Sequence, residues 1–263
     1  MAQEKAADYP ISSVVRALKI LKLFDKDHRT MSLTDISQRA GVNKSSVLRV
    51  LDSLEAEGFV RRSDETKKYM LGIELFKLGN SGYEFGDFRN LAHPFIKKAV
   101  DEIGLMAHLG IIEDDQVMVI SKIWPQNSVE AMALVSVVGG VVPPHCTGVG
   151  KVLLAFSDQE TRKRVLDHCG FEPYTPKTIT SRKKFEAELE KVRKLGYAVN
   201  NGEHESYIRC TTYPVYNGKG KLLAAISLTG LEQIVEEMDP QVIHSALRSL
   251  TGQIQDETHR YDL

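Results

Sequence analysis

The sequence predicts an α+β protein with two domains of unequal size. Residues 12–57 carry apolar side chains at helical spacing, and a short hairpin rich in Lys and Arg follows them. Beyond residue 87, amphipathic helices alternate with segments of strand character, without internal repeats. With 263 residues, 42% of them hydrophobic and 26% charged, the chain is long enough for one small and one medium-sized domain.

Composition and charge exclude several classes of protein. A net charge of −1 rules out a polybasic, histone-like chain, and the 42% hydrophobic share rules out an acidic disordered chain. The longest apolar segment, residues 131–144, falls short of the roughly 18 residues that a membrane helix needs. The polar first ten residues lack the apolar region of a signal peptide, and the three cysteines form no CxxC pair. We therefore expect a cytoplasmic protein without membrane association.

The first domain is predicted to begin with three helices. Residues 12–26 form the first, Ser32 caps the second with an acidic residue three positions later, and Gly41 ends it. Asn43 caps a third helix over residues 44–57. The apolar spacing in the second and third helices is typical of two helices that cross over a tight turn, the packing rule of a helix-turn-helix, and generic αα-corners can imitate it. The residues that carry this spacing are Ile36, Ala40, Val42, Val47 and Val50.

The third helix and the hairpin carry the residues expected to bind DNA. Arg49 lies in the half of the helix that reaches base edges, and its guanidinium can donate two hydrogen bonds to guanine. The hairpin turns at residues 63–66 and resembles a wing that grips phosphates, although the alternative of a solvated polar face stays open. Residues 1–72 hold 13 Lys and Arg against 10 Asp and Glu, a weak basic bias. The predicted DNA-binding residues are Asn43, Lys44, Ser45, Ser46, Arg49, Arg61, Arg62, Lys67 and Lys68.

The rest of the chain predicts a linker helix over residues 73–87 and a separate domain over residues 88–263. Glycines loosen the helical pattern before the boundary near Asp87. Helices are expected over residues 88–103, 147–155, 185–195 and from Pro240 onward, with a capping box at 157–160, a hairpin at 105–112 and 116–124, and a strand at 128–138.

A second hairpin, residues 208–216 and 221–229, carries polar side chains on one face. If its turn closes symmetrically, Cys210 lies opposite Ser227, and Ile208 lies opposite Thr229. The period of two then places Cys210, Ser227 and Thr229 on the same face. This cluster is either a set of core side chains that satisfy their own hydrogen bonds or the floor of a small polar pocket.

Several segments together resemble the isocitrate-lyase-regulator (IclR) family of bacterial transcription factors, over about residues 12 to 255. They are Arg16-Ala-Leu-Lys-Ile-Leu, Lys44-Ser-Ser-Val-Leu-Arg-Val-Leu, Tyr69-Met-Leu-Gly, Pro143-Pro-His-Cys-Thr-Gly-Val-Gly-Lys-Val-Leu-Leu-Ala, Gly202-Glu-His-Glu and Ile208-Arg-Cys. The order and spacing of these segments make the resemblance specific.

The resemblance implies a winged helix-turn-helix followed by a GAF-like effector domain, a curved antiparallel sheet flanked by helices. It implies binding to a double-stranded DNA operator by homodimers, which in the family often pair into dimers of dimers. It also implies a small organic or aromatic carboxylic acid over the sheet, its carboxylate held by backbone amides at the start of a helix. The positions implied are Leu134, Val142, Gly148, Val149, Asn200, Cys210, Ser227 and Thr229. Two positions depart from the family pattern: Asn200 replaces a common carboxylate, and Tyr207 replaces a usual glycine.

Three other functions are alternatives to a ligand-responsive regulator. The segment at 145–152 fails as a phosphate loop, because His145 and Val152 replace the required Gly and Ser or Thr. An enzyme with a Cys210 nucleophile would need His145 or His204 nearby, which their positions in the sequence do not guarantee. A constitutive DNA-binding scaffold would bind no effector. The scattered histidines suggest no metal site, and no cofactor is expected.

Overall fold

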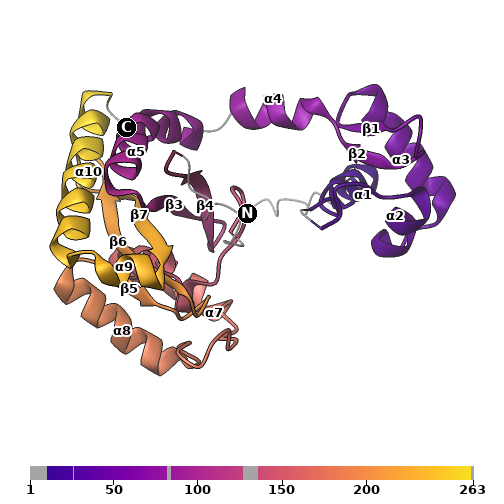
Figure 1. The fold of residues 1–263 in the computed structure, drawn as a ribbon. Coiled ribbons are helices and arrows are strands. Elements are labelled where there is room, and N and C mark those ends of the chain that lie inside the picture. Colours follow the sequence, from indigo (N-terminus) through magenta and orange to yellow (C-terminus); the bar gives the residue numbers. More distant parts are fainter. Residues whose placement is uncertain (1–10, 26, 82–83, 127–135, 262–263) are drawn as a thin grey trace, which may run out of the picture. The chain divides into compact units, whose positions relative to one another are not determined.

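The computed structural model describes residues 11–25, 27–81, 84–126 and 136–261 (Figure 1). The chain divides into two compact units, Met1–Gly86 and Asp87–Leu263, and each is considered by itself. Of the predicted linker helix over residues 73–87, all described residues are helical, and residues 82 and 83 lie outside the described residues. Helix α4 covers Ile73–Ser81, and α5 begins at Glu84 and continues to Ile103, so that it extends beyond the expected linker.

The first unit contains three helices and a two-stranded hairpin. They are α1 (Ser12–Leu21), α2 (Leu33–Ala40), α3 (Lys44–Ala56), β1 (Val60–Arg62) and β2 (Tyr69–Leu71). Helix α1 is shorter than predicted, because the N–H groups of Leu23 and Phe24 bond to carbonyls three residues back and tighten the last turn.

The caps of α2 and α3 agree with the sequence. Ser32 and Asp35 form a reciprocal capping box, Gly41 adopts the left-handed conformation with φ 64°, and the Asn43 side chain accepts from the Ser46 N–H. The buried core that holds the helices to the hairpin consists of Ile20, Phe24, Met31, Ile36, Val47, Leu51, Val60 and Tyr69. The packing of α2 against α3 is thus the predicted helix-turn-helix.

The second unit is built on a five-stranded antiparallel sheet with the strand order β4-β3-β7-β6-β5. The strands are β3 (Met106–Glu113), β4 (Gln116–Ile123), β5 (Ala198–Asn201), β6 (Ile208–Tyr216) and β7 (Leu222–Leu231). With the helices on its faces, this sheet confirms the predicted α+β fold class, an N-terminal helix-turn-helix joined to an antiparallel sheet flanked by helices.

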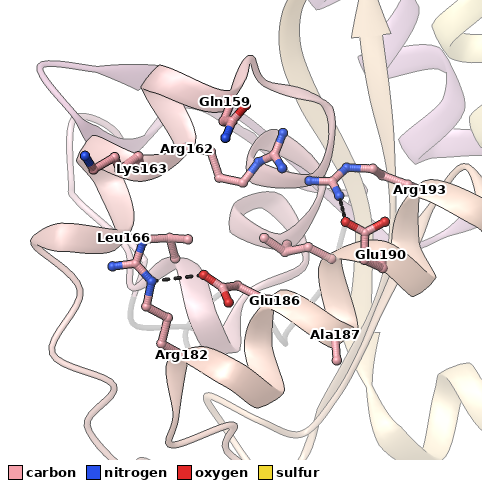
Figure 2. Close-up of a pocket in the computed structure, with 10 residues that line it drawn as sticks. Gln159, Arg162, Lys163, Leu166, Arg182, Glu186, Ala187, Glu190 and Arg193 are labelled. Carbon is pink, nitrogen blue, oxygen red and sulfur yellow. Dashed lines mark hydrogen bonds and ion pairs between the residues drawn. The ribbon is translucent and has the colours of Figure 1, made fainter.

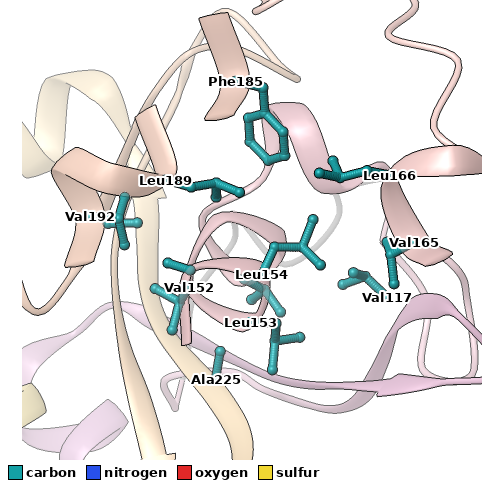
Figure 3. Packing of buried hydrophobic residues seen from close by; sticks show 13 residues of the cluster. Val117, Val152, Leu153, Leu154, Val165, Leu166, Phe185, Leu189, Val192 and Ala225 are labelled. Atoms are coloured by element: carbon teal, nitrogen blue, oxygen red, sulfur yellow. The ribbon is translucent and has the colours of Figure 1, made fainter. Parts of the chain in front are cut away.

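One face of the sheet is covered by α6 (Gly148–Phe156), which contacts β3, β6 and β7. Helices α7 (Gln159–Asp167) and α8 (Arg182–Leu195) follow and frame a groove (Figure 2). Between these helices and the sheet lies a cluster of buried apolar side chains (Figure 3), among them Val152, Leu154 and Phe185. Burial of this cluster holds the three helices on the sheet.

The opposite face of the sheet is covered by α10 (Pro240–Arg260), capped by Asp239 as predicted. Tyr213 points away from its neighbour Thr212, because adjacent strand residues alternate between faces, and its hydroxyl lies 3.0 Å from His244 Nδ1 on α10. The remaining short elements are η2 (Pro144–Cys146) and α9 (Glu232–Glu237).

The register of the second hairpin differs from the prediction. Cys210 pairs with Thr229, and Thr212 pairs with Ser227. The expected pairing was wrong for two reasons: the Asn217 N–H bonds to the Lys221 carbonyl, so the turn is longer, and a bulge beside Val215 adds another residue. Because the total shift is even, every side chain stays on its predicted face.

Three smaller expectations also change. The helix cap near residue 157 is Asp158, whose carboxylate accepts from the Thr161 N–H, so Ser157 is not the cap. The strand predicted at 128–138 lies mostly outside the described residues, and its last three residues are not in a strand. Strand β5 and helix α9 were not predicted. No helix in the described ranges has both the length and the apolar character to cross a membrane.

Candidate DNA-binding surface and effector site

The first half of α3 presents polar side chains to solvent. Lys44, Ser45 and Arg49 are exposed, whereas Ser46 is half-buried. Asn43 is committed to the fold, because its Oδ1 accepts from the Ser46 N–H and the Ser45 hydroxyl, both at 2.9 Å. The structure therefore leaves Arg49 and Lys44 as the long cationic side chains of this surface.

A hollow of about 590 Å³ lies beside Arg49, between α1 and α3. Arg16 of α1 lines the same hollow, together with Ser46 and Ser53. Arg16 is not among the DNA contacts predicted from the sequence. Its position beside Arg49 follows from the packing of α1 against α3, which the local sequence does not show.

The β1–β2 hairpin carries four basic residues, all exposed. Arg62 is partly held in place, because its guanidinium lies 5.4 Å from the centre of the Tyr69 ring and its Nε donates to the Lys67 carbonyl. Arg61, Lys67 and Lys68 extend from the hairpin without a carboxylate partner in the described part of the chain. Such a hairpin suits phosphate contacts.

In the second unit, the start of α6 lies directly on the polar face of the sheet. A Cβ atom on Gly148 would collide with Thr212 Oγ1 and lie 2.8 Å from Cys210 Sγ. A Cβ atom on Gly110 of β3 would collide with Val149. Only glycine at these two positions lets the helix approach so closely. Helix geometry leaves the amides of Gly148 and Val149 without intrahelical acceptors, at the positive end of the helix dipole.

Cys210, Ser227 and Thr229 share one buried face of the sheet, as the alternation predicted. Ser227 Oγ lies 3.1 Å from Thr229 Oγ1, and Cys210 Sγ lies 3.7 Å from Thr212 Oγ1. Thr212, which was not predicted from the sequence, belongs to the same polar cluster and lies beneath Gly148.

His108 of β3 extends the polar face and was missed in the sequence. It pairs with Ser227 on one side and Lys122 on the other, and its ring nitrogens lie 3.4 Å from Thr229 Oγ1 and 2.8 Å from Ser136 Oγ. Burial lowers the pKa of His108 to about 3, with the charge of Lys122 as a second cause. His108 is therefore a neutral hydrogen-bonding group at physiological pH.

The other predicted effector residues have different surroundings. The Asn200 amide bonds to the backbone, since Nδ2 donates to the Cys146 carbonyl at 2.7 Å and Oδ1 accepts from the Gly202 and Glu203 N–H groups. Val142 is half-buried and packs against the cluster around α6. Tyr207 is 45% exposed, and Leu134 lies outside the described residues.

Lys151 of α6 is completely buried and has a structural role. Its ammonium donates to Glu203 Oε1 at 2.7 Å, to Glu188 Oε1 at 3.3 Å and to the Val199 carbonyl at 3.1 Å. Burial raises the pKa of Glu203, which the charge of Lys151 counteracts. The lysine thus ties α6 to β5 and to the segment after it.

The geometry does not suit a Cys210 nucleophile. Burial raises the pKa of this thiol and favours its protonated form. His145 instead contacts the Glu172 carbonyl and Cys169 Sγ, and the His204 ring lies against Tyr174. The residues that the structure describes contain no group of three His, Cys, Asp or Glu side chains able to hold a metal ion.

The helix-turn-helix of the first unit is typical of a DNA-binding regulator, and comparisons with known proteins agree. Residues 13–64 match the family model "IclR helix-turn-helix domain", and residues 85–256 match "Bacterial transcriptional regulator IclR C-terminal". The chain belongs to the IclR family of bacterial transcriptional regulators. It is a regulator rather than an enzyme, since its relatives are named as regulators and repressors.

Among its relatives are two regulators of Escherichia coli K12. The chain is 32% identical to the HTH-type transcriptional regulator XynR, over 87% of this chain and 90% of XynR. It is 30% identical to the HTH-type transcriptional regulator KdgR, over 93% of each chain.

Solved structures share the fold. An IclR transcriptional regulator from Alicyclobacillus acidocaldarius aligns with a TM-score of 0.80 and 29% identity, over 95% of this chain and all of that chain. An IclR homologue from Microbacterium hydrocarbonoxydans, complexed with 4-hydroxybenzoate, aligns with a TM-score of 0.84 and 22% identity, over 95% and 100%.

The close contact at Gly148 makes a testable prediction. Gly148→Ala should destabilise the second unit by about 1–3 kcal/mol, because the added methyl displaces α6 from Thr212 and Cys210. Gly252→Ala in α10 is the matched control, because no atom lies within 4 Å of its Cβ position and alanine favours a helix. Urea unfolding of both variants measures the difference, and equal stabilities would contradict the contact.

The buried, neutral His108 predicts a pH dependence of stability. Its pKa is about 3 in the folded protein and about 6.5 in the unfolded chain, so between these values the unfolded state binds more protons. Its contribution is present above pH 6.5 and is lost as the pH falls, by about 2 kcal/mol between pH 7 and pH 5.

Urea unfolding at both pH values tests this effect. His108→Gln should lose less stability on acidification than the wild type, whereas His168→Gln, which changes an exposed histidine, should behave as the wild type does. An unchanged pH dependence in His108→Gln would contradict the assignment.

Proposed function

We propose that this protein is a ligand-responsive, sequence-specific regulator of transcription that represses genes in the cytoplasm. The proposal is supported above all by the start of α6, where Gly148 lies directly against Cys210 and Thr212, on the buried sheet face that also carries Ser227 and Thr229. Helix-start amides facing neutral hydroxyl groups suit a small organic or aromatic carboxylic acid, because the amides hold its carboxylate. The bound 4-hydroxybenzoate of the Microbacterium homologue is an acid of this class.

The effector site in this proposal keeps the residues predicted from the sequence. They are Val142, Gly148, Val149, Asn200, Cys210, Ser227 and Thr229, with Leu134 outside the described residues. Asn200 contributes by holding the backbone around Cys146 and Glu203, since its amide bonds to both segments. His108 joins the site as a neutral hydrogen-bonding group.

The first unit is proposed to read a double-stranded DNA operator. Arg49 contacts bases and the hairpin contacts phosphates, so that the two parts supply specificity and salt-dependent affinity. The residues in this proposal are Asn43, Lys44, Ser45, Ser46, Arg49, Arg61, Arg62, Lys67 and Lys68.

The protein is proposed to act as a homodimer that can pair into a dimer of dimers. Apolar side chains of the first unit remain exposed in the single chain: Val14 and Leu18 on α1, and Ile73 and Leu78 on α4, each by more than half. An exposed apolar face of this kind fits association with a second copy, and two first units can then read two half-sites. The acid acts by favouring one arrangement of the dimer, with a coupling of about 1–3 kcal/mol.

The DNA-binding roles are tested with two variants. Arg49→Ala should weaken binding to an operator selected from random DNA by about 1–3 kcal/mol and leave non-specific binding nearly unchanged. The double variant Lys67→Ala, Lys68→Ala should instead lower the salt slope of binding to any duplex by up to about 2. An unaltered operator affinity in the first variant would show that Arg49 does not contact bases. An unaltered salt slope in the second would show that the hairpin is an ordinary solvated surface.

Effector binding is tested by thermal melts of the full chain with a panel of small aliphatic and aromatic carboxylic acids. An acid at 100 times its Kd adds about 2.7 kcal/mol and raises Tm by several degrees. Ser227→Ala should reduce this rise, whereas Ser245→Ala, an exposed serine on α10, should not. A chain that binds DNA but melts unchanged with every acid would favour the constitutive scaffold instead.

A further inference from the structure

A groove between α7 and α8 lies outside the surfaces discussed so far. It has a volume of about 470 Å³ and is formed entirely by described residues. Figure 2 shows side chains from both helices directed toward this shared space, with the guanidinium groups of Arg162 and Arg193 next to each other. A hollow of this size can hold a small metabolite.

The lining of the groove carries an excess of positive charge. Arg162, Lys163, Arg182 and Arg193 line the groove together with two carboxylates, those of Glu186 and Glu190, and a third carboxylate, Asp167, pairs with Arg182 at 2.7 Å from outside the lining. Both carboxylates are already occupied, since Glu186 pairs with Arg182 at 3.0 Å and Glu190 pairs with Arg193. Within the described ranges, Arg162 and Lys163 form no ion pair, and nearby carboxylates act on them only at longer range, Glu190 on Arg162 and Asp167 on Lys163.

Arg162 and Arg193 are held rigidly at the C-terminal end of α6. Arg162 donates from Nε to the Leu154 carbonyl at 3.0 Å and from Nη2 to the Ser157 carbonyl at 2.9 Å, and Arg193 Nε donates to the Ala155 carbonyl. These bonds satisfy carbonyls that every helix leaves free at its end. These hydrogen bonds explain why the two guanidinium groups lie next to each other. Lys163 makes none of them.

The two neighbouring cations are electrostatically incomplete. Burial lowers the pKa of Arg162, and the charge of Arg193 lowers it further. Arg193 Nη2 is buried and has no hydrogen-bond partner. A buried donor without a partner costs free energy.

We propose that this groove is a second ligand site that binds a small oxyanion, either inorganic phosphate or the phosphate group of a small metabolite. Arg162 and Lys163 supply the donors, and the neighbouring Arg193 adds positive charge. Guanidinium groups match the oxygens of phosphate in geometry, and the lysine adds a point charge at the open side. The site is independent of the carboxylic-acid site proposed at the start of α6.

The test titrates the wild-type full chain with inorganic phosphate by calorimetry, at an ionic strength held constant with sodium chloride. A parallel titration uses glycerol 3-phosphate as a phosphate monoester. Lys163→Gln removes an exposed charge and should weaken binding by about fivefold. Lys184→Gln removes an exposed charge on α8 that does not line the groove, and it should bind as the wild type does.

Each result decides the proposal. Saturable binding of phosphate or of the monoester that Lys163→Gln weakens and Lys184→Gln retains supports it, and the tighter of the two ligands identifies the source. No saturable binding in the wild type, or equal weakening in both variants, overturns it. A reduced salt slope for DNA in Lys163→Gln without any phosphate binding also overturns it, in favour of a contact with the duplex.

Discussion

The architecture of the second unit depends on the close packing of α6 against the sheet. Gly148 lies against the side chains of Thr212 and Cys210, and Gly110 leaves space for the side chain of Val149, so the helix lies unusually close to the strands. This contact brings the first amides of the helix to a buried polar surface, and it presses Val152 and Leu154 into the apolar cluster (Figure 3). A single packing constraint therefore forms both the core and the candidate site.

Charged groups hold both ends of this helix. Lys151, in its first half, is buried against Glu203 and Glu188, which links α6 to β5 and α8. Arg162 and Arg193 bind the carbonyls at its other end. Loss of one partner would leave a buried charge unpaired, so these contacts keep the helix in one position even though such pairs add little net stability.

Much of the candidate site was readable from the sequence. The alternation along β6 and β7 identified Cys210, Ser227 and Thr229 as one face, and an even register error left that result intact. His108 and Thr212 were not predicted as site residues, because a lone histidine or threonine in an apolar strand carries no local signal. Their roles depend on which strands become neighbours, and the pairing of β3 with β7 joins residues more than 100 positions apart.

By itself the sequence determined the helix-turn-helix, its caps at Ser32, Gly41 and Asn43, the fold class and the family, because these rest on local periodicity and short spacings. The tertiary structure alone decided the hairpin register, the neutral state of His108, the commitment of the Asn200 amide to the backbone and the meeting of Arg162 with Arg193. These properties arise from burial and from contacts between distant segments. Local patterns do not encode such contacts, since the free energy of a buried polar group depends on every element packed around it.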